Sequence, residues 1–206
     1  MQTGQLILTL EGHSNAVSNL VVMPTGELIS ESWDLTVRVW NPSTGKLIRS
    51  LPGNHDVWGL IALHTGQLAI AESEEKIFIW NIATGQVVRE LKFAGQSDMP
   101  FSIVGLPNGE LVSYSHDKLF RVWNTTSGEL KKTKEKSGRP TYTSFAVLPS
   151  GELASGGDYE IRIYNTEAWR SRLILESDAG KIETLVALPD GTIISGHADG
   201  SITKWF

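Results

Sequence analysis

The fold is decided by residues 28–41, which read LISESWDLTVRVWN. The second half of this stretch alternates, because the β-branched Val37 and Val39 are separated by the polar Arg38. Alternation of apolar and polar residues is typical of a half-buried strand. An acidic turn around Asp34 separates this strand from an apolar segment at the start of the stretch. The stretch therefore predicts two antiparallel strands joined by a tight turn.

The same pattern recurs along the chain with a period of about 41 residues. An aromatic residue ends each copy, at Trp40, Trp80, Trp123, Tyr164 and Trp205. A glycine followed two residues later by Leu or Ile marks each copy again, at Gly26, Gly66, Gly109, Gly151 and Gly191. Such self-similarity at a fixed period is the signature of a repeat architecture. We therefore predict one domain, residues 1–206, made of units at approximately 4–43, 44–83, 84–126, 127–167 and 168–206.

Each unit reads as four short strands separated by Gly, Pro and Asn residues. No window of about 11 residues shows a sustained helical period, so helix is expected to be scarce. A four-stranded sheet of about 40 residues cannot bury both of its faces alone, whereas sheets stacked radially around an axis bury each other's faces. The sequence thus predicts an all-β fold, a five-bladed β-propeller of four-stranded antiparallel blades.

With His13 upstream, residues 28–41 resemble a WD40 repeat, and the resemblance covers the entire chain at five-fold repetition. It implies a hydrogen-bonded relay of four side chains within a blade, here Trp40, Ser30, His13 and Asp34 in that order. Such a relay is physically sensible, because a buried indole N–H and a buried imidazole each need a partner. Only the first unit has all four residues.

The other units depart from this relay. Gln96 occupies the histidine position of unit three and Asp178 that of unit five, and Tyr164 replaces the tryptophan of unit four. In unit two, Ile70 and Glu74 replace the serine and the aspartate. We therefore expect blade two to be held mainly by apolar packing.

Composition limits the classes of partner. The 206 residues carry 18 basic and 23 acidic side chains, for a net charge of −5, whereas phosphate binding needs clustered Lys and Arg. The absence of cysteine excludes disulfides, thiolate zinc sites and a cysteine nucleophile. No apolar run approaches the ~18 residues of a membrane span, and residues 1–10 lack the basic region of a secretion signal. We expect a cytoplasmic protein with neither nucleic acid nor membrane as its partner.

The position of each chain end within the repeat unit predicts how the ring closes. The chain begins with the strand that follows an aromatic position and ends on Trp205-Phe206. Residues 5–10 would therefore pair with residues 202–205, so that the last blade is closed by the N-terminal strand. Such pairing removes two free sheet edges, which otherwise promote aggregation. We expect closure as a monomeric ring; the alternatives are a fragment of a larger WD-repeat protein and a ring that closes only through oligomerisation.

Histidines and acidic residues offer few candidates for catalysis. His116 and His197 each lie within two residues of an aspartate, in the turn where the repeat itself demands aspartate. A tight turn fixed by the aspartate side chain explains both positions better than a metal site does. Glycoside hydrolysis needs two carboxyl groups that face each other across one pocket, and Asp56 and Glu183 lie on non-adjacent units. We predict no catalytic residue, no metal ion and no cofactor.

The top face, around the central channel, is where we predict binding. In WD40 propellers it is formed by the residues that flank the first core residue of each inner strand and by the residue before the turn aspartate. We transfer these positions to this chain by their place in the repeat unit, and the large side chains among them fall on three consecutive units. The predicted binding residues are Trp33, Asp56, Trp58, Met99, Phe101 and His116. Trp33 and Trp58 are not required by the repeat pattern, and exposed aromatic clusters supply much of the energy of protein binding. The alternative is that these side chains plug a narrow channel.

These patterns favour a non-catalytic protein–protein interaction scaffold that presents its top face to a protein or peptide partner. The resemblance implies scaffolding in general, and because several family members recognise ubiquitin or degradation signals, it points to that class of partner. The alternative is a lectin-like propeller that binds a small ligand. Such a propeller needs equivalent pockets between its blades, and the repeats show no equal set of pocket residues.

Overall fold

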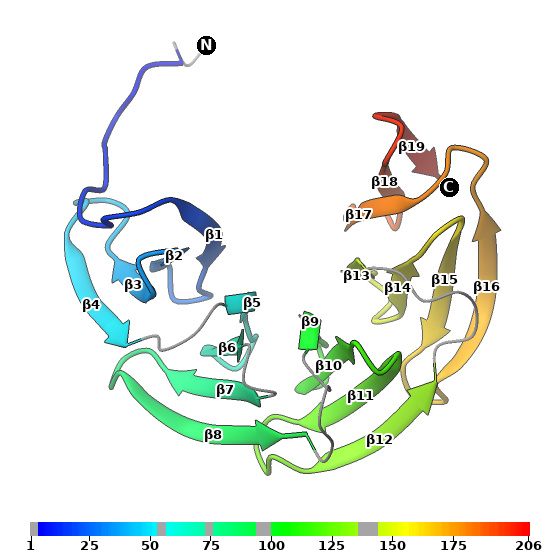
Figure 1. Ribbon diagram of the computed structural model, residues 1–206, viewed down its shortest axis with the longest axis horizontal. Coiled ribbons are helices and arrows are strands. Elements are labelled where there is room, and N and C mark those ends of the chain that lie inside the picture. Colours follow the sequence, from blue (N-terminus) through cyan, green and yellow to red (C-terminus); the bar gives the residue numbers. More distant parts are fainter. Residues whose placement is uncertain (1–3, 53–56, 73–75, 94–99, 136–143) are drawn as a thin grey trace.

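The computed structural model describes residues 4–52, 57–72, 76–93, 100–135 and 144–206. Within these ranges the chain forms 19 strands, and no helix there is long and apolar enough to cross a membrane. The strands form five antiparallel sheets, which are arranged as blades around a common centre (Figure 1). The predicted five-bladed β-propeller is confirmed.

The blades follow one another along the chain, and the first strand of each blade lies nearest the centre (Figure 1). Blade 1 consists of β1 (Val17–Val22), β2 (Leu28–Ser32), β3 (Thr36–Trp40) and β4 (Leu47–Pro52). Blade 2 consists of β5 (Val57–Ala62), β6 (Gln67–Glu72), β7 (Lys76–Asn81) and β8 (Gln86–Lys92). Blade 3 consists of β9 (Pro100–Gly105), β10 (Glu110–Ser115), β11 (Leu119–Asn124) and β12 (Leu130–Glu135). Blade 4 consists of β13 (Phe145–Val147), β14 (Leu153–Gly156), β15 (Glu160–Asn165) and β16 (Arg170–Glu176). Blade 5 consists of β17 (Ile182–Ala187), β18 (Ile193–His197) and β19 (Ile202–Trp205).

A glycine turn joins the innermost strand of each blade to the next strand. In blade 1 the backbone N–H of Gly26 donates to the carbonyl of Met23 over 2.9 Å, and Gly26 has a φ of +97°. Glycine adopts such angles without steric strain. The same left-handed conformation occurs at Gly66, Gly109, Gly151 and Gly191. The glycines that mark each repeat unit in the sequence therefore lie in the turns between the first and second strands of the blades.

The hydrophobic core lies between neighbouring blades. Ile29 and Val37 of blade 1 pack with Leu60 and Leu68 of blade 2. Three further clusters join blade 2 to blade 3, blade 3 to blade 4 and blade 4 to blade 5 in the same way. Blades 2, 3 and 4 thus bury both of their faces, whereas blades 1 and 5 each have one neighbour.

Polar contacts also tie the outermost strand of one blade to the next blade. Nη2 of Arg49 in β4 donates to the carbonyl of Ala83 over 3.1 Å, and Nη2 of Arg89 in β8 donates to that of Thr126 over 2.6 Å. The accepting turn needs glycine, because a Cβ on Gly85 would lie 2.6 Å from Cδ of Arg49. We call this contact between an outer-strand arginine and the following turn the arginine clasp.

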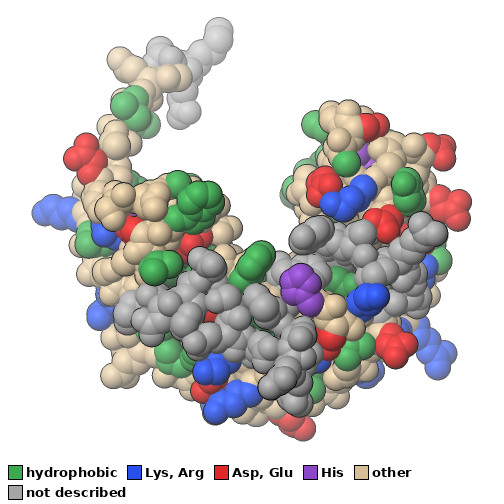
Figure 2. Space-filling view, viewed as in Figure 1, with side chains coloured by type: hydrophobic (Ala, Val, Ile, Leu, Met, Phe, Trp, Pro, Cys, Tyr) green, Lys and Arg blue, Asp and Glu red, His purple; other side chains and the backbone are tan. Residues whose placement is uncertain are grey.

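The predicted closure by the N-terminal strand is not present in this structure. The last blade has three strands, and residues 5–10 form no strand. Figure 1 and Figure 2 both show the ring open between β1 and β17, with the N-terminal segment beside blade 1. The contacts between blades set the angle from each blade to the next, and five blades at this angle do not bring β19 back to residues 5–10.

Candidate functional site

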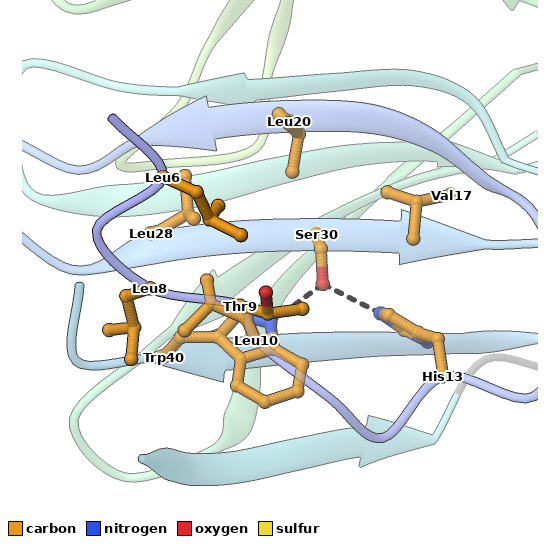
Figure 3. Close-up of a pocket in the computed structure, with 10 residues that line it drawn as sticks. All are labelled: Leu6, Leu8, Thr9, Leu10, His13, Val17, Leu20, Leu28, Ser30 and Trp40. Atoms are coloured by element: carbon orange, nitrogen blue, oxygen red, sulfur yellow. Dashed lines mark hydrogen bonds between the residues drawn. The ribbon is translucent and has the colours of Figure 1, made fainter. Parts of the chain in front are cut away.

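Blade 1 contains the complete hydrogen-bonded relay. The indole N–H of Trp40 donates to Oγ of Ser30 over 2.7 Å. Oγ of Ser30 lies 2.6 Å from Nε2 of His13 (Figure 3), and Nδ1 of His13 lies 2.8 Å from Oδ2 of Asp34. A neutral imidazole with its proton on Nδ1 satisfies these contacts, because it donates to Asp34 and accepts the hydroxyl proton of Ser30. The relay thus ties the chain before β1 to β2, to β3 and to the turn between them.

Asp34 is held as a carboxylate by the donors around it. The backbone N–H of Ser14 lies 3.0 Å from Oδ2, and Thr36 donates its backbone N–H and its hydroxyl to Oδ1 over 3.0 and 2.6 Å. Burial alone would raise the pKa of the Asp34 carboxyl, but the hydrogen bonds from Thr36, His13 and Ser14 outweigh it and hold that pKa well below its ordinary value. The turn between β2 and β3 is therefore fixed by an ionised side chain.

Blade 5 builds its own relay with His197, which lies in β18 and not in the turn that its sequence predicts. The indole N–H of Trp205 donates to Oγ of Ser195 over 2.8 Å, and this Oγ lies 2.7 Å from Nε2 of His197. His197 is buried, and its Nδ1 lies 3.4 Å from the carbonyl of Gly180. Because side chains two residues apart share one face of a strand, the spacing from Ser195 is the signal that could have identified His197.

Blade 3 keeps one contact of the relay, and blade 2 keeps none in the part of the chain that the structure describes. In blade 3 the indole N–H of Trp123 donates to Oγ of Ser113 over 2.9 Å. In blade 2 the indole N–H of Trp80 is buried without a hydrogen-bond partner in the described part of the chain, since Ile70 stands at the serine position. Blade 2 therefore depends on apolar packing, as its sequence indicates.

The turn aspartates of blades 3 and 5 fix backbone. Oδ1 of Asp117 accepts from the backbone N–H of Leu119 over 3.1 Å, and Oδ1 of Asp199 accepts from that of Ser201 over 2.9 Å. These contacts are the expected Asx-type turns. Across the residues that the structure describes, no three His, Asp or Glu side chains come together as potential metal ligands.

Three of the predicted binding residues lie together at one end of the blades. Each second strand runs antiparallel to the innermost strand, so the β2–β3 and β10–β11 turns lie at the end where the innermost strands begin. Trp33 and His116 lie in these turns, and Trp58 is the second residue of β5. All three side chains are exposed, Trp33 to 67% and Trp58 to 45%. They are the predicted binding residues whose side chains the structure describes.

The side chains of the other three predicted residues lie outside the described part of the chain. Asp56 and Met99 lie outside the described residues. Phe101 belongs to β9, at the position that Trp58 has in β5, and its side chain is likewise outside the described part.

A second feature lies between blade 1 and the N-terminal segment. An open pocket of about 400 Å³ is lined there by mainly apolar side chains (Figure 3). The segment contributes Leu6, Leu8 and Leu10, and blade 1 contributes Leu20 and Leu28. Three of the four relay residues, His13, Ser30 and Trp40, also line this pocket. It lies on the face of blade 1 that is turned away from blade 2.

Two comparisons with known proteins concern the fold. A family model described as WD domain, G-beta repeat, matches residues 4–41, which coincide with the first repeat unit. The crystal structure of the WD40 beta propeller domain of Doa1 superimposes with a TM-score of 0.80 and 24% sequence identity, over 98% of this chain and 67% of that chain. This second likeness shows the fold alone.

Curated relatives share shorter stretches. Protein tipD of Dictyostelium discoideum is 29% identical over 109 residues, which cover 52% of this chain and 17% of that protein. The Periodic tryptophan protein 2 homolog of Schizosaccharomyces pombe is 45% identical over 62 residues, which cover 29% of this chain and 7% of that protein. The chain therefore spans less than a fifth of the length of either relative. With the repeat period, the five antiparallel blades and the family match in agreement, the chain belongs to the WD40-repeat β-propeller family.

Proposed function

We propose that this chain is a non-catalytic interaction scaffold whose top face binds a protein or peptide partner. The observation that carries the proposal is the exposure of Trp33 and Trp58 on one face, whereas Trp40, Trp80 and Trp123 are buried. Exposed tryptophans are common anchors of protein interfaces, because each ring buries a large apolar area on binding. WD40 propellers are generally scaffolds of this kind.

Trp33 is held in place before any partner arrives. Its backbone N–H donates to the carbonyl of Ala16 over 3.0 Å. The next residue is Asp34, whose carboxylate is fixed by His13 and Thr36. An ordered turn loses less entropy on binding than a disordered one. The relay therefore supports the proposed function by orienting the turn that carries Trp33.

Within this function we propose a monomeric, cytoplasmic protein and a partner of the ubiquitin or degradation-signal class. The support for this finer proposal is the family resemblance, which is an analogy at the level of the fold. The top face offers two indole rings and one imidazole, which suit the apolar side chains of a loop or a short peptide.

Capture of partners from a cell lysate, read by mass spectrometry, tests the proposal. The native protein is compared with Trp33→Ala/Trp58→Ala. The matched control is Val88→Ala/Ile174→Ala, which removes exposed apolar side chains from the outer strands β8 and β16. We expect partners that the native protein and the control capture but the top-face variant does not. Equal capture by three folded proteins would contradict the proposal.

Purified ubiquitin tests the finer proposal separately. Binding to the top face should shift the indole NMR signals of Trp33 and Trp58. Unshifted signals, together with top-face-dependent capture from the lysate, would reject ubiquitin and retain the scaffold.

A further inference from the structure

The outermost strand of blade 3, β12, carries a lysine where the corresponding strands of blades 1 and 2 carry buried leucine. By strand register, Lys134 holds in β12 the position of Leu51 in β4 and of Leu91 in β8. Leu51 is 1% exposed and Leu91 is 0% exposed, and each packs against the following blade. Lys134 is half-buried. An ammonium group in such a position costs free energy unless it gains partners.

Lys134 is held by neutral groups of blade 4. Its Nζ donates to the carbonyl of Trp169 and lies 5.5 Å from the ring centroid of Tyr164. Trp169 is buried, and its backbone N–H closes the same turn that Gly85 and Gly128 close in blades 2 and 3. A carbonyl oxygen and an aromatic face carry only partial negative charge. These contacts therefore orient the ammonium group but leave its positive charge uncompensated.

Two further cations lie close to Lys134. Burial is the largest cause that lowers the pKa of the Lys134 ammonium, and the positive charges of Lys132 and Arg170 lower that pKa further. Lys132 and Arg170 are exposed. Within the described part of the chain, none of these three side chains forms an ion pair with a carboxylate. We call Lys132, Lys134 and Arg170 the rim cluster.

Other cations on the same two strands do have acidic partners. Nζ of Lys131 lies 2.5 Å from Oε1 of Glu110, and Nε of Arg172 lies 2.7 Å from Oε1 of Glu152. The net charge of the whole chain is −5. The uncompensated positive charge is therefore a local feature of the rim cluster, and a negatively charged ligand would compensate it.

The rim cluster lies along a free sheet edge. The sheet of blade 3 has the order β12-β11-β10-β9, so only one side of β12 pairs with a described strand. Figure 1 shows β12 and β16 on the outer rim, away from the innermost strands. A free edge presents backbone N–H and C=O groups to which an extended peptide can add as a further strand. Lysines on this edge repel a basic strand and attract an acidic one.

We propose that β12 and the rim cluster bind an acidic segment of a partner protein, which adds to the free edge as an extended strand. Lys132 and Lys134 are two residues apart and therefore share one face of β12. An added strand presents every second side chain to that face, so the segment carries Asp or Glu at alternate positions. Opposite charges on adjacent strands stabilise their pairing. This surface is separate from the top face, so the inference does not rest on the proposed function.

Single-stranded nucleic acid is the competing class of anion. Proteins that bind it combine a positively charged groove with exposed aromatic rings on which the bases stack. The aromatic neighbours of the rim cluster, Tyr164 and Trp169, are only 2% and 5% exposed. This burial favours a peptide.

Fluorescence anisotropy at near-physiological salt tests the inference with two labelled peptides. One peptide is TETETETE, and the other is TTTTEEEE, which has the same charge without the alternation. The native protein is compared with Lys132→Gln/Arg170→Gln and with the matched control Lys131→Gln/Arg172→Gln, which removes the same charge from exposed residues of the same two strands. We expect the native protein and the control to bind TETETETE about tenfold or more tightly than the rim-cluster variant does, and to prefer it to TTTTEEEE.

Four results would overturn the inference. Equal binding by the three proteins would mean that the rim cluster is not the site. A Kd above about 1 mM for TETETETE and the native protein would mean that no such site exists. Equal affinity for the two peptides would exclude recognition of alternating acids. Tighter binding of oligothymidine, lost in the rim-cluster variant, would replace the peptide by nucleic acid.

Amide hydrogen exchange tests whether the peptide adds as a strand. Saturating TETETETE should slow exchange in β12 but not in β8, which is also an outermost strand. Exchange that slows in both strands or in neither overturns the inference. Both variants should melt at the temperature of the native protein, because the substituted side chains are exposed. A loss of binding without a change in melting temperature is then a loss of the site and not of the fold.

Discussion

Two buried tryptophans of this protein differ by a single polar contact. Trp40 and Trp80 hold the same repeat position, but Trp40 donates to Ser30, whereas Trp80 has no hydrogen-bond partner in the described part of the chain. A buried donor without a partner has lost its hydrogen bond to water and has gained nothing in return. The same substitution should therefore have different effects at the two positions.

Trp40→Phe should lower the free energy of unfolding by more than Trp80→Phe does. Phenylalanine removes a hydrogen bond at position 40 and an unsatisfied donor at position 80, a difference of about 1–3 kcal/mol. The loss of volume is the same, so Trp80→Phe is the matched control. Urea unfolding followed by circular dichroism measures both losses. Equal losses would mean that the relay does not stabilise blade 1.

Asp34 makes the stability of blade 1 dependent on pH. The pKa of its carboxyl is lowered in the folded protein, and in the unfolded chain it lies near about 3.9. A lowered folded-state pKa gives stability that is fully present above the unfolded-state pKa and is lost as the pH falls toward the folded-state pKa. The difference in unfolding free energy between the native protein and Asp34→Asn should therefore be constant from about pH 7 to pH 5 and shrink below about pH 4.

Denaturant titrations of these two proteins at several pH values measure this difference. A difference that is the same at pH 7 and at about pH 3 would show that the Asp34 carboxylate does not contribute through its charge.

At the scale of the strand and the turn, the local sequence pattern was sufficient to predict the structure. The strand around Val39 and the turn at Gly26 are determined by residues close to them in the chain, so both could be predicted from the sequence. The relay of blade 1 could be predicted because its residues keep the phase of the repeat. His197 was missed because it reaches Ser195 from within its own strand. The open ring was missed because the angle between sheets is set by packing, which no short pattern encodes.

The arginine clasp predicts a specific order of glycine substitutions. Gly85→Ala should destabilise the protein more than Gly26→Ala does, although positive φ strains alanine at both positions by about 1–2 kcal/mol. At Gly26 nothing lies within 4 Å of the new Cβ, whereas at Gly85 it would displace Arg49 from the carbonyl of Ala83. In an Arg49→Ala background the additional loss at Gly85 should disappear. Thermal unfolding measures the three single variants and the double variant; an additional loss that persists would exclude the clasp as its cause.

At the scale of the whole molecule, the effect of a charged substitution depends on whether a neighbouring blade covers the substituted strand. Ile202→Lys should leave the melting temperature nearly unchanged and reduce self-association, because the side chain is exposed and lysine protects a free sheet edge. Val37→Lys, at the equivalent buried position of blade 1, should prevent stable folding, because it buries an unpaired charge. Calorimetry and light scattering measure both effects. Similar destabilisation by the two substitutions would mean that β19 is covered in solution.

The arrangement of blades in an open arc also affects how the gene can evolve. The described blades contact one another in chain order, and the core clusters join consecutive blades. A duplication or deletion of one unit at either end of such an arc leaves the remaining interfaces as they were, whereas in a closed circle it would change the angle at every blade. Each unit can then diverge by itself after duplication. The relay already differs between units: it is complete in the first, whereas the tryptophan N–H of the second has no hydrogen-bond partner in the described part of the chain.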